Sequence, residues 1–205
     1  MNGKENKMAN VLIIGATGSL GQSLRRELST TNHKLTLFSR SAGRLSDLRV
    51  NETAMAGSVT NPIDLESILA EQEIVFAALS GNLTKMTEDL TIAMEETKVK
   101  RLIFISSMGI YNEIPSSVDA SGNLKNNPML KDYRNAADIV EQSSLDYTII
   151  RPGWFDNGTD EYKITHKGEP FRGYAVSRGA ISKLVHQIIE NPQLYSNESI
   201  GISRP

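Results

Sequence analysis

The stretch VLIIGATGSLGQSLRREL, residues 11–28, constrains the fold more than any other part of the chain. Four apolar residues run directly into a glycine, two further glycines follow at intervals of three, and leucines then recur at a spacing of four. The first part is typical of a strand buried on both faces, and the last part of an amphipathic helix. A turn almost free of side chains between such a strand and helix predicts the opening unit of a dinucleotide-binding fold.

Each of the three glycines has its own physical role in such a turn. Gly15 permits a tight exit from the strand, Gly18 lets a pyrophosphate approach the backbone, and Gly21 lets the helix pack closely on the sheet. The start of the helix offers unpaired N–H groups and a partial positive charge to phosphates. Thr17 and Ser19 add hydroxyls that either contact the phosphates or cap the helix. The alternative is a glycine-rich turn that is needed only for packing.

Short apolar runs recur along the chain and alternate with helical stretches. The runs expected to be strands are 10–15, 34–39, 52–57, 73–79, 101–107 and 146–153. This alternation predicts the α/β class, with a doubly wound parallel sheet of Rossmann type and helices on both faces. We expect one domain over residues 1–205, with residues 1–9 flexible. Residues 152–205 are expected to form the substrate side, with a long loop that holds a short hairpin, a helix and a final strand.

Composition excludes several classes of protein. The chain has no cysteine, which rules out disulfides, thiolate zinc sites and cysteine nucleophiles. His33, His166 and His186 lie far apart without metal-ligand spacing, and we expect no metal site. A formal net charge of -2 gives no electrostatic attraction to nucleic acid or to an anionic membrane. No run approaches the roughly 20 apolar residues of a membrane span. We therefore expect a cytoplasmic monomer or homodimer that binds a small-molecule substrate.

The end of the second expected strand bears on which dinucleotide is bound. An acidic residue there would hold the ribose 2′-hydroxyl and favour NAD. Ser39 and Arg40 occupy that place instead, and Arg44 follows one helical turn later. A guanidinium offers paired donors to a 2′-phosphate, which favours NADP as the cofactor, with NAD as the alternative. The other interpretation of Arg40 is a solvated surface arginine.

Three motifs together resemble one family: GATGSLG at 15–21, ISSMGIY at 105–111 and LDYTIIRPGW at 145–154. They resemble the atypical short-chain dehydrogenase/reductases of the NAD(P)-binding, NmrA-like type, and among these the flavin reductase/biliverdin reductase branch. The resemblance runs over nearly the whole chain. It includes YKITHKGEPFRGYAVSR at 162–178, which is similar to that group's substrate-side hairpin. The motifs are specific for fold and cofactor and poorly specific for substrate.

The resemblance implies a set of cofactor-binding residues. They are, in chain order, Gly15, Thr17, Gly18, Ser19, Leu20, Arg40, Ser58, Val59, Ala78, Leu79, Ser80, Ser106, Pro152, Gly153 and Trp154. The first five would hold the pyrophosphate, and Arg40 would face the adenosine phosphate. Ser58 and Val59 would contact adenine, although the family often has an Asp where Ser58 stands. The segment 78–80 would lie beside the nicotinamide ribose, and 152–154 would line the nicotinamide pocket.

The catalytic residues of ordinary members are only partly present. Those members use a Ser, a Tyr and a Lys four residues after that Tyr, because the ammonium lowers the pKa of the phenol for proton transfer. Here Pro115 stands four residues after Tyr111, and Ala137 stands four residues after Tyr133. This departure argues against conventional alcohol dehydrogenation. The flavin reductase-like branch manages without the pair, by positioning a flavin or tetrapyrrole over the nicotinamide.

Each catalytic candidate also has a structural interpretation. By the resemblance, Ser107 is the leading functional hydroxyl and Ser106 the next, but a serine at the end of a strand also bonds its own backbone. Tyr111 would either stack on or hydrogen-bond a substrate, or pack at the base of its loop. Tyr133 would face the rim of the cleft or the core. Trp154 would stack on an aromatic substrate or lie in the core.

Three other polar residues are interpreted as structural first. Arg151 is expected to tie the end of the sixth strand to neighbouring carbonyls. Arg178 is expected to cap or pair near the start of the last helix, and His166 to be a solvated strand histidine. None of the three is assigned a catalytic role.

Three functional hypotheses follow. The leading one is an NADP-dependent oxidoreductase that transfers hydride to a flavin, quinone or similar conjugated acceptor, which makes flavin a candidate substrate. The second is a regulatory protein that senses NADP(H) without turnover, as some NmrA-like proteins are thought to do, and the missing Tyr–Lys pair supports it. The third, a nucleotide-sugar epimerase or dehydratase, is disfavoured by the short tail and by the same missing pair.

Overall fold

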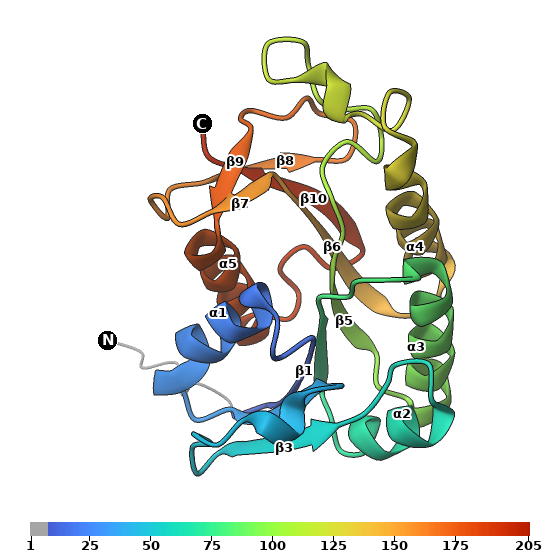
Figure 1. Ribbon diagram of the computed structural model, residues 1–205, viewed down its shortest axis with the longest axis vertical. Helices are drawn as coiled ribbons and strands as arrows, with labels where there is room; N and C mark the ends of the chain where they lie inside the picture. The colour runs from blue at the N-terminus through green and yellow to red at the C-terminus, as the bar shows by residue number, and fades with distance from the viewer. Residues whose placement is uncertain (1–7) are drawn as a thin grey trace.

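Eight strands form a sheet at the centre of the computed structural model, which describes residues 8–205 (Figure 1). The strand order is β3-β2-β1-β4-β5-β6-β10-β8, and neighbours pair in parallel except β8 and β10, which are antiparallel. Their bounds are β1 Asn10–Ile14, β2 Lys34–Ser39, β3 Glu52–Ala56, β4 Ile74–Ala77, β5 Arg101–Ile105, β6 Asp146–Pro152, β8 Lys163–His166 and β10 Glu198–Ser203. The predicted α/β class with a Rossmann-type sheet is confirmed. The expected flexibility of residues 1–9 falls mostly on residues outside those described.

Helices cover both faces of the sheet, with α1 and α5 on one face and α2, α3 and α4 on the other (Figure 1). Their bounds are α1 Ser19–Glu27, α2 Pro62–Leu69, α3 Leu83–Thr97, α4 Lys131–Gln142 and α5 Arg178–Glu190. Consecutive residues of β1 enter different cores: Val11 and Ile13 pack on the α1 and α5 side, and Leu12 and Ile14 on the other. This explains why the strands read as continuous apolar runs. Within residues 8–205, every helix is too short or too polar to cross a membrane.

The turn between β1 and α1 is built as the glycine spacing predicts. Gly15 has a φ of +83°, and a Cβ there would lie 2.3 Å from the carbonyl oxygen of Ala78, just after β4. A Cβ on Gly21 would lie 2.3 Å from the carbonyl oxygen of Gly15. The first position therefore requires glycine for its backbone conformation and its contact with β4. The second requires glycine because the helix packs directly on the turn.

The start of α1 differs from the starts of three other helices. The side chains of Asn61, Asn82 and Ser177 accept hydrogen bonds from first-turn amides of α2, α3 and α5. These oxygens replace the carbonyl partners that a first turn lacks. The N-cap of α1 is Gly18, and no side chain in the described part of the chain caps its first turn. The amides at the start of α1 therefore remain available to an outside acceptor.

The predicted hairpin before the last helix is wrong. Three short strands occur there, β7 Trp154–Asp156, β8 Lys163–His166 and β9 Ala175–Ser177. β7 and β9 pair in parallel as a separate two-stranded sheet, and β8 joins the main sheet beside β10. The physical reason is the free edge of β10, whose backbone N–H and C=O groups would otherwise lack a partner strand.

The variant Gly21→Ala is expected to lower the free energy of unfolding by about 1–3 kcal/mol, because the new Cβ overlaps the backbone of the turn. This cost exceeds the gain of up to about 1 kcal/mol that alanine brings to a helix. Urea denaturation followed by circular dichroism measures the change. Gly43→Ala is the matched control, since a Cβ there has its nearest neighbour, the Cβ of Ala56, at 3.8 Å. Equal denaturation midpoints for the two variants would contradict the close packing.

Candidate functional site

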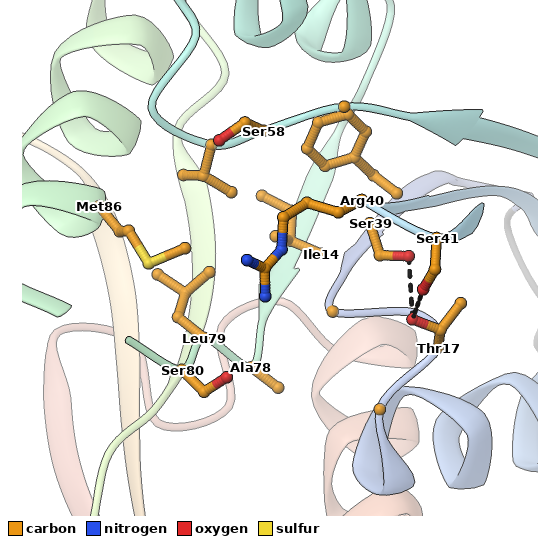
Figure 2. A pocket seen from close by; sticks show the side chains of 15 residues that line it. Ile14, Thr17, Ser39, Arg40, Ser41, Ser58, Ala78, Leu79, Ser80 and Met86 are labelled. Carbon is orange, nitrogen blue, oxygen red and sulfur yellow. Dashed lines mark hydrogen bonds between the residues drawn. The ribbon is translucent and has the colours of Figure 1, made fainter. Parts of the chain in front are cut away.

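A pocket of about 230 Å³ lies where β1, β2, β3 and β4 end (Figure 2). It brings together most of the residues predicted for the cofactor, namely Gly15, Thr17, Gly18, Arg40, Ser58, Val59, Ala78, Leu79 and Ser80. The carboxyl ends of parallel strands are where such sheets bind ligands. Two of the five residues predicted for the pyrophosphate do not line this pocket: Ser19 is exposed, and Leu20 is buried in the core beneath α1.

Arg40 is the one cationic side chain of residues 8–205 that lines this pocket. Figure 2 shows its guanidinium pointing into the pocket, between the glycine turn and the segment after β4. Among residues 8–205, no carboxylate forms an ion pair with Arg40. The guanidinium is therefore free to bind an anion in the pocket.

Three hydroxyls form a cluster beside Arg40. Thr17 Oγ1 lies 3.0 Å from Ser39 Oγ and 2.9 Å from Ser41 Oγ, so that the glycine turn is joined to the end of β2 (Figure 2). No role for Ser41 was predicted from the sequence. The run Ser-Arg-Ser after a buried strand was the available signal, because residues just beyond a parallel strand reach the ligand edge of the sheet.

The turn after β3 is held by α2. The carboxylate of Asp64 accepts a hydrogen bond from the backbone N–H of Ser58 at 2.8 Å, and the hydroxyl of Ser58 lies 2.9 Å from that of Thr60. Val59 is buried, and Met86 of α3 closes the same side of the pocket. An apolar wall next to small polar groups is typical of a site for a flat base.

A second pocket, of about 360 Å³, lies where β5 and β6 end. Its lining residues are Ser106, Ser107, Met108, Asn127, Met129, Leu130, Tyr133, Pro152, Gly153, Trp154 and Phe155. It therefore collects residues 152–154, predicted to line the nicotinamide pocket, together with Ser106 and two of the three catalytic candidates, whereas 78–80 line the first pocket. Ala77 of β4 is in register with Phe104 of β5, so the segments after these strands, which line the two pockets, are neighbours.

The two serines after β5 differ in their hydrogen bonds. Ser107 Oγ donates to the carbonyl oxygen of Met108 at 3.1 Å, which is the backbone role weighed as its structural interpretation. Ser106 Oγ is buried and has no hydrogen-bond partner within residues 8–205. A buried hydroxyl without a partner is rare in proteins, and a bound molecule or water at the pocket would complete it. Of the two serines, Ser106 therefore carries the hydroxyl that is free to donate a hydrogen bond.

The two candidate tyrosines are in different places. Tyr133 on α4 lines the second pocket. Tyr111 lines neither pocket, and its hydroxyl donates to Glu141 at 2.7 Å. Burial, together with the Glu141 carboxylate, raises the pKa of the Tyr111 phenol above its usual range. The guanidinium groups of Arg134 and Arg151 lie over the Tyr111 ring at 4.7 and 5.0 Å from its centroid, so this side chain is packed at the base of its loop.

Trp154 is exposed rather than buried, which overturns the alternative that it lies in the core. It keeps 63% of its surface, and its ring stacks on Tyr174 with centroids 6.2 Å apart. Strand β7 carries it outward from the end of β6, and its backbone N–H donates to the carbonyl oxygen of Tyr174 at 2.9 Å. The ring is thus held at the mouth of the second pocket.

Arg151 is fully buried, and its partners go beyond the expected carbonyls. It forms an ion pair with Glu113, and its guanidinium also donates to the hydroxyl and the carbonyl oxygen of Ser199. The other two structural interpretations fit the geometry. Arg178 begins α5 and donates to the carbonyl oxygen of Asp156, and His166 is exposed on β8.

Asp132, at the start of α4, holds the first turn of α3. Its carboxylate accepts hydrogen bonds from the backbone N–H groups of Leu83 (2.7 Å) and Thr84 (3.0 Å) and from the Thr84 hydroxyl. Partial burial acts to raise the pKa of Asp132, but these hydrogen bonds outweigh it and lower the pKa below its usual 3.8. The contact joins the segment after β4, in the first pocket, to the helix that carries Tyr133.

Two histidines that are distant in sequence meet near the amino-terminal ends of the strands. His33 Nε2 lies 2.9 Å from Glu190, His186 Nδ1 lies 2.9 Å from Glu27, and nitrogens of both rings and the Glu190 carboxylate lie within 4.8 Å of one another. The backbone N–H of Ala9 donates to His33 Nδ1 at 3.2 Å, which places the ring proton on Nε2. A metal would need that nitrogen free, so this arrangement is a hydrogen-bonded link between α1, α5 and β2. Spacing in the sequence gave no signal for it.

A family model described as NAD(P)H-binding matches residues 15–192. The chain belongs to this NAD(P)H-binding family. The match begins at Gly15, the first residue of the turn that lines the first pocket. The resemblance to NAD(P)-binding, atypical short-chain dehydrogenase/reductases is confirmed, and the first pocket is the place in the fold where the family's dinucleotide is expected.

Two solved structures are similar over nearly the whole chain. A Rossmann-fold NAD(P)-binding family protein from Shigella flexneri is 34% identical with a TM-score of 0.83, covering 97% of this chain and 95% of that one. A short-chain dehydrogenase/reductase from Veillonella parvula, in complex with NADP, is 26% identical with a TM-score of 0.89, covering 97% of this chain and 96% of that one.

Among curated sequence relatives, the chloroplast protein TIC 62 of Arabidopsis thaliana is 25% identical over 98% of this chain. The chain spans only 36–45% of the length of the first curated relatives it matches.

The variant Arg40→Ala is expected to weaken NADPH binding by about 10- to 100-fold and to leave NADH binding nearly unchanged, because a charged hydrogen bond to the 2′-phosphate is lost. Isothermal titration calorimetry with both dinucleotides measures the two affinities. Arg44→Ala is the matched control, since Arg44 is exposed on the same segment but does not line the pocket. If Arg40→Ala kept the full preference for NADPH, the assignment of Arg40 would be wrong.

The variant Asp132→Asn is expected to lower the free energy of unfolding by about 1–2 kcal/mol near neutral pH, because an amide group replaces an oxygen that accepts from an N–H. The folded-state pKa of Asp132 is lowered, so this stabilisation is present above pH 3.8 and is lost as the pH falls through the lower folded value. Urea titrations at a series of pH values measure the difference. Asp138→Asn, in a half-exposed pair with Arg134 on the same helix, is the control and should show less than about 0.5 kcal/mol.

Proposed function

We propose that this protein is an NADP-dependent oxidoreductase that transfers hydride to a flavin, a quinone or a similar flat conjugated acceptor. One observation carries the proposal: a polar pocket with the glycine turn and a free arginine adjoins an apolar pocket with an exposed tryptophan, at the ends of neighbouring strands β4 and β5. Hydride transfer requires donor and acceptor to be held in contact, and two adjoining sites of these chemistries serve that requirement.

The residues of the first pocket fit NADP. The uncapped amides at the start of α1 suit a pyrophosphate, and Arg40 with the hydroxyl cluster suits a 2′-phosphate. Ser106, in the adjoining second pocket, supplies a buried hydroxyl that still needs a partner. NADPH held by these residues would supply a hydride, which the acceptor would take up together with one proton from water.

The chain's own residues contribute orientation and a dry surface rather than a proton relay. Tyr133 lines the second pocket, the acceptor pocket of this proposal, but the residue four positions later is the buried Ala137 and not the lysine that ordinary members use. Ser107 bonds the carbonyl of Met108 and fixes the turn after β5. The acceptor ring would lie against Trp154, whose ring is held from behind by Tyr174.

A regulatory protein that binds NADP(H) without turnover is the second candidate. The specific observation in its favour is that neither Tyr111 nor Tyr133 is followed four residues later by a lysine, and that the Ser107 hydroxyl is engaged with the backbone. The cytoplasmic location and the monomeric or homodimeric state stay predictions from the sequence.

Steady-state turnover tests the proposal. Purified protein is mixed with NADPH and either FMN or a naphthoquinone, and the loss of the nicotinamide absorbance band is followed. We expect turnover, and we expect Trp154→Ala to raise the KM for the acceptor roughly tenfold, because stacking is worth about 1 kcal/mol or more. Trp154→Phe is the matched control that keeps an aromatic ring and should retain most of the affinity.

The regulatory alternative predicts that NADPH binds but is not oxidised. Tight NADPH binding by calorimetry, with no acceptor of any kind oxidising it, would establish that alternative over the reductase. Ser107→Ala and Ser106→Ala then separate the two serines. If the free donor acts on the acceptor, Ser106→Ala lowers kcat and Ser107→Ala changes it little.

A further inference from the structure

Among the residues that the structure describes, the lining of the acceptor pocket has no ionisable acid or base apart from a phenol. Its polar side-chain groups are the two serine hydroxyls, the Asn127 amide, the Tyr133 hydroxyl and the indole N–H of Trp154. No Asp, Glu, Lys, Arg or His side chain from residues 8–205 lines it. A charged group placed on a ring inside such a pocket would lose water without gaining a partner, which is costly.

Two large apolar side chains at this pocket are far more exposed than is usual for their type. Met129 keeps 84% of its surface and Trp154 keeps 63%. Exposed apolar surface around a concave site is typical of a binding face that a ligand covers. Methionine adapts to flat surfaces, and tryptophan offers a rigid one, so this pair suits a planar ring system.

One cation, Arg178, contacts an aromatic residue of the pocket without lining the pocket itself. The guanidinium of Arg178 lies 5.5 Å from the centroid of the Phe155 ring. It donates to the carbonyl oxygen of Asp156 and to the side-chain oxygen of Asn157. Arg178 is not one of the residues that line the acceptor pocket.

The volume limits the size of the ring. About 360 Å³ is at the lower end of the roughly 300–1,000 Å³ of ligand pockets in general. Two or three fused rings fit such a space better than an extended open-chain tetrapyrrole, which also carries carboxylates.

Resting on the function proposed above, we propose that the acceptor is an uncharged quinone or flavin ring of two or three fused rings, bound against Trp154 and Met129. Any anionic substituent must project into solvent. Selectivity thus depends on the charge of the ring itself and not on a phosphate carried by a flexible tail. Met129 is the specificity-determining residue, because it is the most exposed apolar side chain of the lining.

The first test compares acceptors with the unmodified protein. 1,4-Naphthoquinone and its 2-sulfonate differ by a charge on the ring, and riboflavin and FMN differ by a charge on the tail. We expect kcat/KM for the sulfonate to be at least roughly tenfold lower, because the ring charge would be desolvated without a partner. We expect riboflavin and FMN to agree within about threefold, as for a screened charge in solvent.

The second test moves a charge into the pocket. Met129→Arg is expected to raise kcat/KM for the sulfonate relative to the neutral quinone by roughly 3- to 10-fold, as for one partly solvated ion pair. Val50→Arg adds the same charge at a fully exposed residue before β3, at the opposite end of the strands, and should leave that ratio unchanged. NADPH affinity of both variants, measured by calorimetry, reports that the dinucleotide pocket is intact.

The outcomes separate this inference from the proposed function. If the unmodified protein reduces the sulfonate as well as the neutral quinone, or if Met129→Arg and Val50→Arg behave alike, the inference is wrong while the reductase stands. If NADPH binds but neither quinones nor flavins are reduced, both are wrong.

Discussion

The buried ion pair between Arg151 and Glu113 is the contact on which the arrangement of the acceptor side depends. Arg151 has no exposed surface, and burying a charge costs several kcal/mol unless partners surround it. Glu113 completes the set by also accepting from the backbone N–H groups of Gly109 and Tyr111. The pair thereby ties the loop after β5 to β6 and, through Ser199, to β10. A stabilising contact at this depth fixes where the segment 106–108 lies, and so fixes one wall of the acceptor pocket.

Much of the fold could be predicted from the sequence because its determinants are local. A strand buried on both faces needs a continuous apolar run, and the glycine turn needs its spacing, so β1, α1 and the order of elements followed directly from the sequence. The position of β8 did not follow. Its pairing with β10 joins residues such as Thr165 and Gly201, and no local pattern in 163–166 specifies that distant partner. The same reason explains why parallel pairing of β7 and β9 was mistaken for a hairpin.

The candidate site was predicted unevenly for a related reason. Residues immediately after strands, such as Arg40 and Ala78, lie at the ligand edge of the sheet because of the topology alone, and the pocket contains them. Topology does not determine which hydroxyl finds a hydrogen-bond partner. The Ser107 hydroxyl donates to the carbonyl oxygen of Met108, whereas the Ser106 hydroxyl has no partner within residues 8–205. Side-chain exposure is equally non-local, which is why the sequence left Trp154 undecided between core and surface.

The contacts of Thr17 with Ser39 and Ser41 affect how the pocket distinguishes a ribose with a 2′-phosphate from one without it. Each hydroxyl brings one hydrogen, and two mutual contacts use two of them, so a single hydrogen is left to offer outward. Rotation about a C–O bond turns that hydrogen toward a phosphoryl oxygen or turns a lone pair toward a ribose alcohol. Three rotatable hydroxyl groups therefore accommodate a phosphate or a ribose hydroxyl at nearly equal free-energy cost. Discrimination between NADP and NAD must then come from the permanent charge of Arg40, which lies beside the three hydroxyls.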